Sequence, residues 1–352
     1  MALQWQKSIH PQRYLGCPDM GLNDFSPEII LALVAIALVL IDALFWPRRM
    51  SRGNGYLAFC GSLIALAFSL WEWETSARGY SVGGVISRDA FSAFFAVLIL
   101  SVLVGVLLLC LHEAQNYVRD EFYILVLLSA LGMMLAVSAV DLLVVFLAIE
   151  LTGLPLYILA AREGRAGIKG ETAAKLVHWG LFSSAFFLFS VGLLYAATGA
   201  TTLIDIDAYW RGENIDSLAQ LGAALLVVSL LFKAGVIPFH YWLVDLREGA
   251  ATSLAAFVAS AGAAASLAVL ARILSTGLGP LRPVWSPTIA VVAGVTIVAA
   301  ALMALNQRRL KRLLSYLVVV EGGCFLAGFS SGRSEGLAAA LFCCAVLTLG
   351  LV

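Results

Sequence analysis

The sequence predicts an all-α membrane protein with about eleven transmembrane helices, and composition is the first reason. Of its 352 residues, 61% are hydrophobic and only 12% are charged, and the mean hydropathy is +0.95. Soluble domains carry about 25% charged residues, so most of this surface must face a lipid bilayer. The second reason is the spacing of long apolar runs, and the third is a pair of ionisable residues deep inside two of them.

Each predicted helix is an apolar run of about 20 residues, the length that crosses a bilayer. The runs lie at about 26–46, 56–73, 89–112, 121–139, 141–161, 172–198, 219–243, 250–273, 286–305, 310–330 and 334–352. The polar joints between them are too short to hold a soluble domain. We therefore expect a polar extension over residues 1–24, which lacks the apolar core of a signal peptide, and one transmembrane domain over residues 25–352.

Basic residues in the joints predict the orientation, because cytoplasmic loops are enriched in Lys and Arg. Joints after odd-numbered spans hold 12 basic residues in tight clusters, whereas the amino terminus and the other joints hold 8, among them Arg88 and Arg272. The amino terminus is therefore expected outside. Asp245, Arg247 and Glu248 fall in the joint after the seventh span, where solvated or capping roles suffice.

Two ionisable residues lie where lipid should exclude them. Glu150 stands inside the run DLLVVFLAIELTGLPLYILAA, and Lys233 stands about fourteen residues into the seventh run. A charge at the centre of a span costs about 2.5–3.5 kcal/mol, so such residues normally face a bundle interior or a water-filled path and handle ions or protons. The alternatives are a glutamate that locks helices together by hydrogen bonds and a lysine that snorkels from an ordinary proline kink.

The seventh run contains a predicted break. Lys233 is followed by Gly235 and Pro238, and a proline lacks a backbone donor and clashes with the carbonyl four residues earlier. Transporters use helices broken in the middle of the membrane to expose backbone groups beside an ion path. His240 follows the break, where it suits a proton relay because histidine titrates near neutral pH. It suits equally the capping of freed carbonyls.

Two more ionisable residues complete the candidate set. Lys175 lies one turn into the sixth run, where it either pairs with Glu171 at i,i+4 or modulates Glu150 on the adjacent helix. Glu321 stands twelve residues into the tenth run, a depth that suggests a second acidic site. The sequence holds no Cys or His spacing typical of a metal or redox centre and no nucleotide-binding loop. We therefore expect no cofactor on this chain and no nucleic acid partner.

Four segments carry a family resemblance: LGMMLAVSAVDLLVVFLAIELTGLPLYILAA, ETAAKLVHWGLFSSAFFLFSVGLLYAATGATTL, FKAGVIPFHYW and LNQRRLKRLLSYLVVVEGG. They look like the antiporter-like membrane subunits of respiratory complex I, and subunit N is the closest match. The wider superfamily also holds Mrp-type sodium/proton antiporter subunits and membrane subunits of energy-converting hydrogenases. The resemblance covers about residues 25–352 and implies an antiporter-like inverted-repeat fold. Its second repeat is expected to be truncated, because the chain stops in the eleventh run.

The resemblance also implies roles for the candidate residues. Glu150 and Lys233 would form a paired site that exchanges protons when a neighbouring subunit drives it. Lys175 would tune the pair, and His240 would follow the break. The implied function is a proton-translocating membrane subunit, a translocase, of an NADH:quinone oxidoreductase. NADH, flavin, iron–sulfur clusters and quinone would be bound by partner subunits in the same assembly, which the resemblance implies to lie in a bacterial inner (plasma) membrane.

Three departures from the family pattern keep other functions open. Ala263 stands where the family has a central lysine, Glu321 replaces a histidine, and the chain stops before the helix that bears the exit-side lysine. Water held near Ser260 and Ser266 would bridge the first gap. The alternatives are a subunit of an Mrp-type cation/proton antiporter or of a membrane-bound hydrogenase, and a non-pumping scaffold paralogue, which Ala263 and the early stop favour.

Overall fold

A computed structural model describes residues 26–44, 51–75, 80–82, 84–113, 120–162, 169–212 and 216–350. The expected polar extension, residues 1–24, lies outside these described residues. The described part of the chain is almost wholly helical, which confirms the predicted fold class. Within it, nine helices are long and apolar enough to cross a membrane, and two shorter apolar helices accompany them.

Each of the eleven apolar runs holds helix in the structure. The first six hold α2 (Ser26–Leu44), α3 (Ser51–Thr75), α4 (Ala90–Glu113), α5 (Asp120–Ser138), α6 (Leu142–Arg162) and α7 (Lys169–Thr198). The seventh folds as α9 (Ser217–Lys233) and α10 (Tyr241–Gly249), and the eighth as α11 (Thr252–Phe257), η3 (Val258–Gly262), α12 (Ala263–Arg272) and η4 (Ile273–Gly277). The last three hold α13 (Arg282–Leu305), α14 (Leu310–Ser330) and α15 (Ser334–Gly350).

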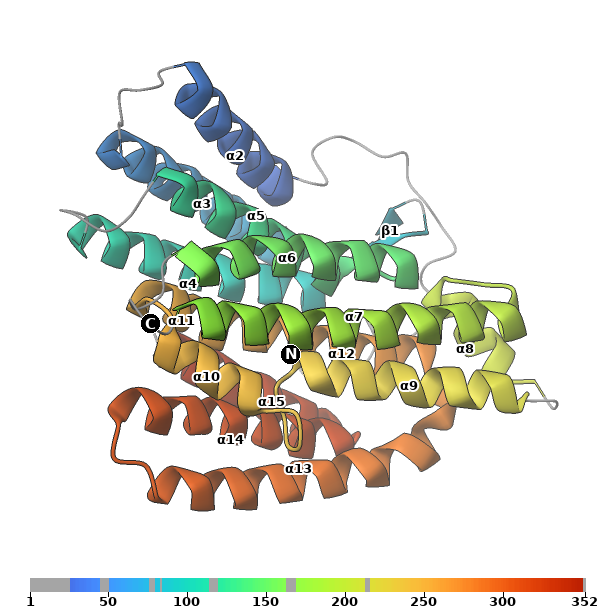
Figure 1. The fold of residues 1–352 in the computed structure, drawn as a ribbon. Coiled ribbons are helices and arrows are strands. Elements are labelled where there is room, and N and C mark those ends of the chain that lie inside the picture. The colour runs from blue at the N-terminus through green and yellow to red at the C-terminus, as the bar shows by residue number, and fades with distance from the viewer. Residues whose placement is uncertain are drawn as a thin grey trace.

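The helices run side by side in one bundle, with α2 and α3 toward one edge and α13 and α14 at the opposite edge (Figure 1). In the apolar part of Thr252–Gly277, 83% of the residues are buried. In the apolar part of Arg282–Leu305, only 22% are buried. The first stretch therefore forms the centre of the bundle, where α12 contacts α4, α5, α9 and α14. The second presents apolar side chains such as Val291 and Leu302 outward, as a helix facing lipid or another subunit does.

The break in the seventh run is confirmed. Helix α9 ends at Lys233, and α10 begins after a non-helical segment. Gly235 has φ +65°, a left-handed conformation that glycine adopts without a steric penalty, and Pro238 has no N–H with which to continue the helix. The indole of Trp242 donates a hydrogen bond of 3.1 Å to the carbonyl of Phe232. One of the carbonyl groups at the end of α9 is thereby satisfied.

The eighth run extends beyond the predicted range of 250–273 and is less regular than expected. It includes two π-helical turns, η3 and η4, and such turns occur frequently at functional sites. The first of them ends directly before Ala263, the position where a lysine was expected. Nothing in an apolar pattern distinguishes a π turn from an α turn, so the sequence did not predict either one.

Four short elements were not predicted. They are β1 (Tyr80–Val82), β2 (Ile86–Arg88), α8 (Leu203–Trp210) and the single turn η5 (Gly279–Leu281). The strands form an antiparallel hairpin, and Ile86 bridges to Ala139 after α5. Helix α8 begins beside this point, where Leu203 N–H donates to the carbonyl of Val140 over 2.8 Å. The segments are too short and too polar to stand out in a hydropathy pattern.

Two arginines assigned to joints are instead buried inside the protein. Arg272 makes two hydrogen bonds to Asp89, of 2.8 and 3.0 Å, and the two side chains are only 3% and 1% exposed. Arg88 pairs with Glu28 of α2 over 2.5 Å. Because both arginines balance buried carboxylates, their positions carry no information about orientation. The outside location of the amino terminus stays a prediction.

Candidate functional site

Glu150 and Lys233 face each other across neighbouring helices. Glu150 projects from the middle of α6, and Lys233 is the last residue of α9, immediately before the break. Lys233 Nζ and Glu150 Oε1 are 3.9 Å apart, and the side chains are 17% and 19% exposed. A carboxylate and an ammonium at this separation attract each other strongly in surroundings from which water is largely excluded. The two residues singled out by their depth in the sequence therefore form one site.

Ser184 of α7 joins the two charged groups. Its hydroxyl donates a hydrogen bond to Glu150 Oε1 and accepts one from Lys233 Nζ over 3.1 Å. Three helices thus contribute one polar group each to the same point. The sequence analysis did not select this residue, although the Ser183–Ser184 pair stands in the middle of a long apolar run. Polar residues at that depth were the available signal, but serine is too common in membrane helices for the signal to be specific.

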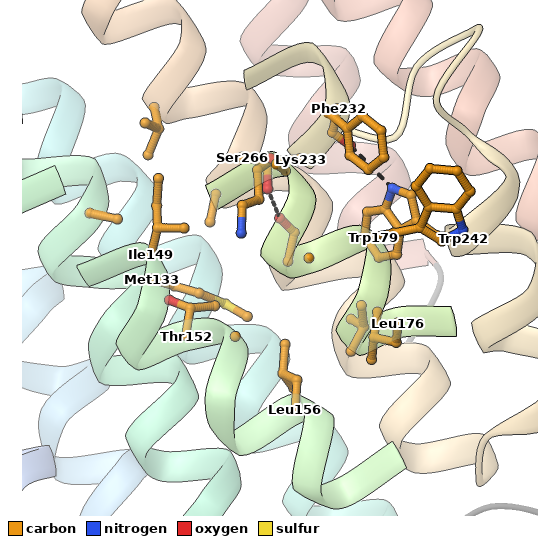
Figure 2. Close-up of a pocket in the computed structure, with 18 of the residues that line it drawn as sticks. Met133, Ile149, Thr152, Leu156, Leu176, Trp179, Phe232, Lys233, Trp242 and Ser266 are labelled. Atoms are coloured by element: carbon orange, nitrogen blue, oxygen red, sulfur yellow. Dashed lines mark hydrogen bonds between the residues drawn. The ribbon is translucent and has the colours of Figure 1, made fainter. Parts of the chain in front are cut away.

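A cavity of about 100 Å³ opens beside Lys233. Its walls are mostly apolar, and polar side chains enter at Lys233, Thr152, Ser183 and Ser266. Figure 2 shows the Lys233 side chain directed into this space, with Ser266 of α12 beside it and Thr152 of α6 below. A water molecule occupies roughly 10–15 Å³ on this measure, so the volume suits a small cluster of waters. The lining includes Gly262 and Ser266, which flank Ala263 in the chain.

Lys175 lies apart from this site. Its ammonium pairs with Glu171 over 2.8 Å and with Asp245 of α10 over 3.2 Å, and its side chain is 44% exposed. The hydrogen bond from Lys175 holds the pKa of the exposed Glu171 carboxyl below its usual range. The i,i+4 pairing weighed from the sequence is therefore present. Among the described residues, the ion pairs of Lys175 are with Glu171 and Asp245 and not with Glu150.

His240 lies in the broken segment, directly before α10. Its side chain is buried, and neither ring nitrogen has a hydrogen-bond partner of good geometry among the described residues. The ring packs on Tyr241 with centroids 4.1 Å apart and faces Tyr316 of α14 at 6.0 Å. The residue is the N-cap of α10 and makes no side-chain hydrogen bond to the first turn of that helix.

Glu321 forms a second buried acidic position. It lies in α14, is 2% exposed, and accepts a hydrogen bond of 3.2 Å from Thr348 of α15. Arg247 of α10 interacts with it electrostatically. The Arg247 side chain is 6% exposed, and its Nη1 atom has no hydrogen-bond partner among the described residues.

The charged residues after the break occupy a helix and not a solvated joint, so that part of the sequence interpretation is wrong. Asp245, Arg247 and Glu248 all lie on α10. Asp245 meets Lys175 of α7, and Glu248 forms ion pairs with Arg309 and with Arg312 of α14. Helix α10 is therefore held by charges on both sides. The hydropathy pattern did not predict these ion pairs, because a run of charged residues is typical of a loop, and the partner residues lie far away in the sequence.

Comparison with known proteins assigns this chain to a family. The sequence profile described as "NADH:quinone oxidoreductase/Mrp antiporter, TM" matches residues 139–350, a range that includes Glu150, Lys233 and the other candidate residues. The chain is 35% identical to an NADH-quinone oxidoreductase subunit N of Desulfovibrio desulfuricans, over 90% of this chain and 64% of that protein. It is 39% identical to an NADH-quinone oxidoreductase subunit N of Mycobacterium bovis, over 93% of this chain and 70% of that protein.

The solved structures include a similar chain in "Respiratory complex I from Thermus thermophilus with bound Aureothin". The two chains are 30% identical, with a TM-score of 0.72, and the match covers 92% of this chain and 70% of the other. The chain thus spans roughly two thirds of the length of these relatives. It is an integral membrane protein that belongs to the NADH:quinone oxidoreductase/Mrp antiporter transmembrane family, and within that family to the subunit N type.

Proposed function

We propose that this chain is a proton-translocating membrane subunit of a complex I-like NADH:quinone oxidoreductase. The observation that carries the proposal is the Glu150–Lys233 pair, 3.9 Å apart and mostly buried, at a helix break and beside a cavity. Placing two such charges in a membrane domain costs several kcal/mol. A protein that only scaffolded an assembly would gain nothing from that cost.

The physical chemistry of the pair supports proton exchange. While Glu150 is ionised, it stabilises the ammonium form of Lys233, because each charge compensates the other in low-dielectric surroundings. When the carboxylate is neutralised or drawn away, the ammonium becomes an isolated buried charge, and release of its proton is favoured. The adjoining cavity supplies the space for a proton acceptor, since a few waters fit beside Lys233 and Ser266.

The other candidate residues are proposed to act around this pair. Lys175 would act through Asp245, and so through the position of α10. His240 would relay protons past the break, and Glu321 would hold a proton further along, opposite Arg247. The cavity reaches the residues on both sides of Ala263, which supports a path through water at the point where the lysine is lacking.

The rest of the assembly follows from the same proposal. The partners are other membrane subunits, lipid and protons, in a bacterial inner membrane with the amino terminus outside. NADH, flavin, iron–sulfur clusters and quinone would be held by those partners, and this chain would contribute the translocase step without redox chemistry of its own.

Replacement of Lys233 tests the proposal. In membrane vesicles that contain the full assembly, Lys233→Ala should abolish NADH-driven proton uptake, because the titrating amine is gone. Lys233→Arg should do the same, since a guanidinium keeps the charge but does not release its proton. NADH:quinone electron transfer, measured with an uncoupler present, reports on assembly of both variants. Proton uptake at the normal rate in either variant would remove Lys233 from the mechanism.

A second candidate function is a subunit of an Mrp-type cation/proton antiporter, because the matched family profile spans both classes. An antiporter subunit would use the same residues, but a cation gradient and not NADH oxidation would drive the proton transfer. Under this alternative, a sodium gradient imposed on vesicles without NADH should acidify or alkalinise the lumen, and Glu150→Gln should stop the change. A response to NADH alone favours the first proposal.

A further inference from the structure

The contact between Glu150 and Lys233 runs through a third residue. Their nearest charged atoms are 3.9 Å apart, which is beyond the 2.7–3.2 Å of an N–H···O hydrogen bond. Ser184 bridges the two groups from one side, since its hydroxyl donates to Glu150 and accepts from Lys233 over 3.1 Å. A hydroxyl is suited to this position because it is both a donor and an acceptor. The amine, the hydroxyl and the carboxylate are thus joined by two consecutive hydrogen bonds.

The neighbouring serine shows that this placement is specific to Ser184. The hydroxyl of Ser183 donates to the backbone carbonyl of Ser229 over 3.0 Å, and so ties α7 to α9. Consecutive residues on a helix point about 100° apart, so only one of the two serines faces the charged pair. Both side chains are at least nine-tenths buried. Ser183 thus fastens two helices, whereas Ser184 bridges two charged groups.

We propose that Ser184 is a relay group that passes protons between Lys233 and Glu150. In one direction an N–H bond of the Lys233 ammonium breaks, and its proton bonds to the Ser184 oxygen while the serine's own proton moves to Glu150. Neutral lysine, neutral carboxylic acid and an unchanged hydroxyl result, so charge and protons balance. The reverse step restores the ion pair. This inference rests on the proposed function, because a relay matters only if the pair exchanges protons.

The relay has a consequence that a purely structural serine lacks. Two protons move together in the step, so the rate should be sensitive to replacement of H₂O by D₂O. It should also depend on the presence of a hydroxyl and not on the volume of the side chain. Without the hydroxyl, a water molecule would have to take the same place or the charged groups would have to meet directly.

The test compares four variants in vesicles that contain the full assembly. Ser184→Ala should slow NADH-driven proton uptake about tenfold, the effect of losing one charge-assisted hydrogen bond at the reacting groups, and should change the solvent isotope effect. Ser184→Thr keeps the hydroxyl and should restore most of the rate and the isotope effect. Ser190→Ala and Ser190→Thr should pump normally, apart from any loss of stability, because the buried Ser190 hydroxyl of α7 donates to the carbonyl of Phe187 and does not line the cavity. Uncoupled NADH:quinone electron transfer measures how much assembly is present, so each rate is expressed per assembled complex.

Two results would overturn the relay. One is proton uptake by Ser184→Ala at the normal rate with an unchanged isotope effect. The other is equal loss in Ser184→Thr and Ser184→Ala, which would mean that packing and not the hydroxyl matters. Failure of the relay is separable from failure of the proposed function: if Lys233→Ala abolishes pumping while Ser184→Ala does not, the pair works without the serine. If neither variant affects pumping, the proposed function itself is wrong.

Discussion

At the residue scale, the chemistry of this protein depends on charges confined among apolar helices. Glu150 and Lys233 are each too costly to bury alone, and their separation of 3.9 Å lets each reduce the cost of the other. Ser184 adds the hydrogen bonds that the charged groups would otherwise make with water.

A substitution at Glu150 distinguishes a titrating site from a packing lock. Glu150→Gln keeps the size of the side chain and an acceptor for Ser184 but removes the negative charge. We expect NADH-driven proton uptake to fall by about tenfold or more, because Lys233 loses its counter-charge. Glu150→Asp keeps a carboxylate on a shorter side chain and should retain partial activity. Normal pumping by Glu150→Gln in assembled complexes would mean that the residue serves packing alone.

The sequence was informative about these residues one at a time. The depth of Glu150 and Lys233 in their apolar runs was sufficient to single them out. Ser184 was missed because a serine costs little to bury, so its presence carries little information. Arg247 was placed in a joint for the opposite reason: charges beside a glycine suggest solvent, and only the packed structure shows that this side chain is buried.

At the scale of elements, the broken helix brings Lys233 to the site. If α9 continued through residues 234–240, the carbonyl groups of its last turn would accept hydrogen bonds from the following backbone N–H groups. Lys233 would then lie within a regular helix and not at its end. The left-handed Gly235 and Pro238 end α9 at Lys233 and allow α10 to turn toward α14. Charges on α10 then form ion pairs with α7 and α14.

A pair of glycine substitutions tests the importance of the left-handed turn. Gly235→Ala should lower the free energy of unfolding by about 1–2 kcal/mol, because a Cβ is disfavoured at φ +65°. Gly262→Ala is the control, since Gly262 has helical angles, φ −65° and ψ −43°, and a Cβ there meets atoms at 3.6 Å or more. Thermal unfolding of each variant in detergent measures the difference. Equal midpoints for the two would argue against a required left-handed residue.

At the scale of the whole molecule, a second set of buried charges holds distant elements together. Asp89, at the start of α4, binds Arg272 at the end of α12 through two hydrogen bonds, and the guanidinium also lies 4.9 Å from the ring centroid of Phe91. The two residues are 183 positions apart in the chain. This contact fixes the central helix against α4, and so fixes the frame within which α9 and α10 are positioned.

Removal of one partner of this pair should destabilise the whole bundle. Asp89→Asn removes the carboxylate charge from this buried ion pair, and breaking a buried pair costs about 3–5 kcal/mol of unfolding free energy. Glu121→Gln is the control, because the Arg162–Glu121 pair is 39% and 41% exposed and surface pairs contribute about 1 kcal/mol or less. Denaturation of the purified variants gives both values. Similar small losses in the two variants would show that the buried pair does not support the fold.

The sequence by itself determined which segments form the long apolar helices, where the seventh apolar run breaks, and which two ionisable residues lie inside those runs. Hydropathy is a sum over neighbouring residues, and glycine and proline act on their own backbone, so both can be read along the chain. Only the tertiary structure decided that Ser184 lies between Glu150 and Lys233, that Lys175 meets Asp245, and that Arg247 and Arg272 are buried. Those contacts depend on how each helix is rotated about its axis and on which helix lies beside it, and that is set by the packing of the whole bundle.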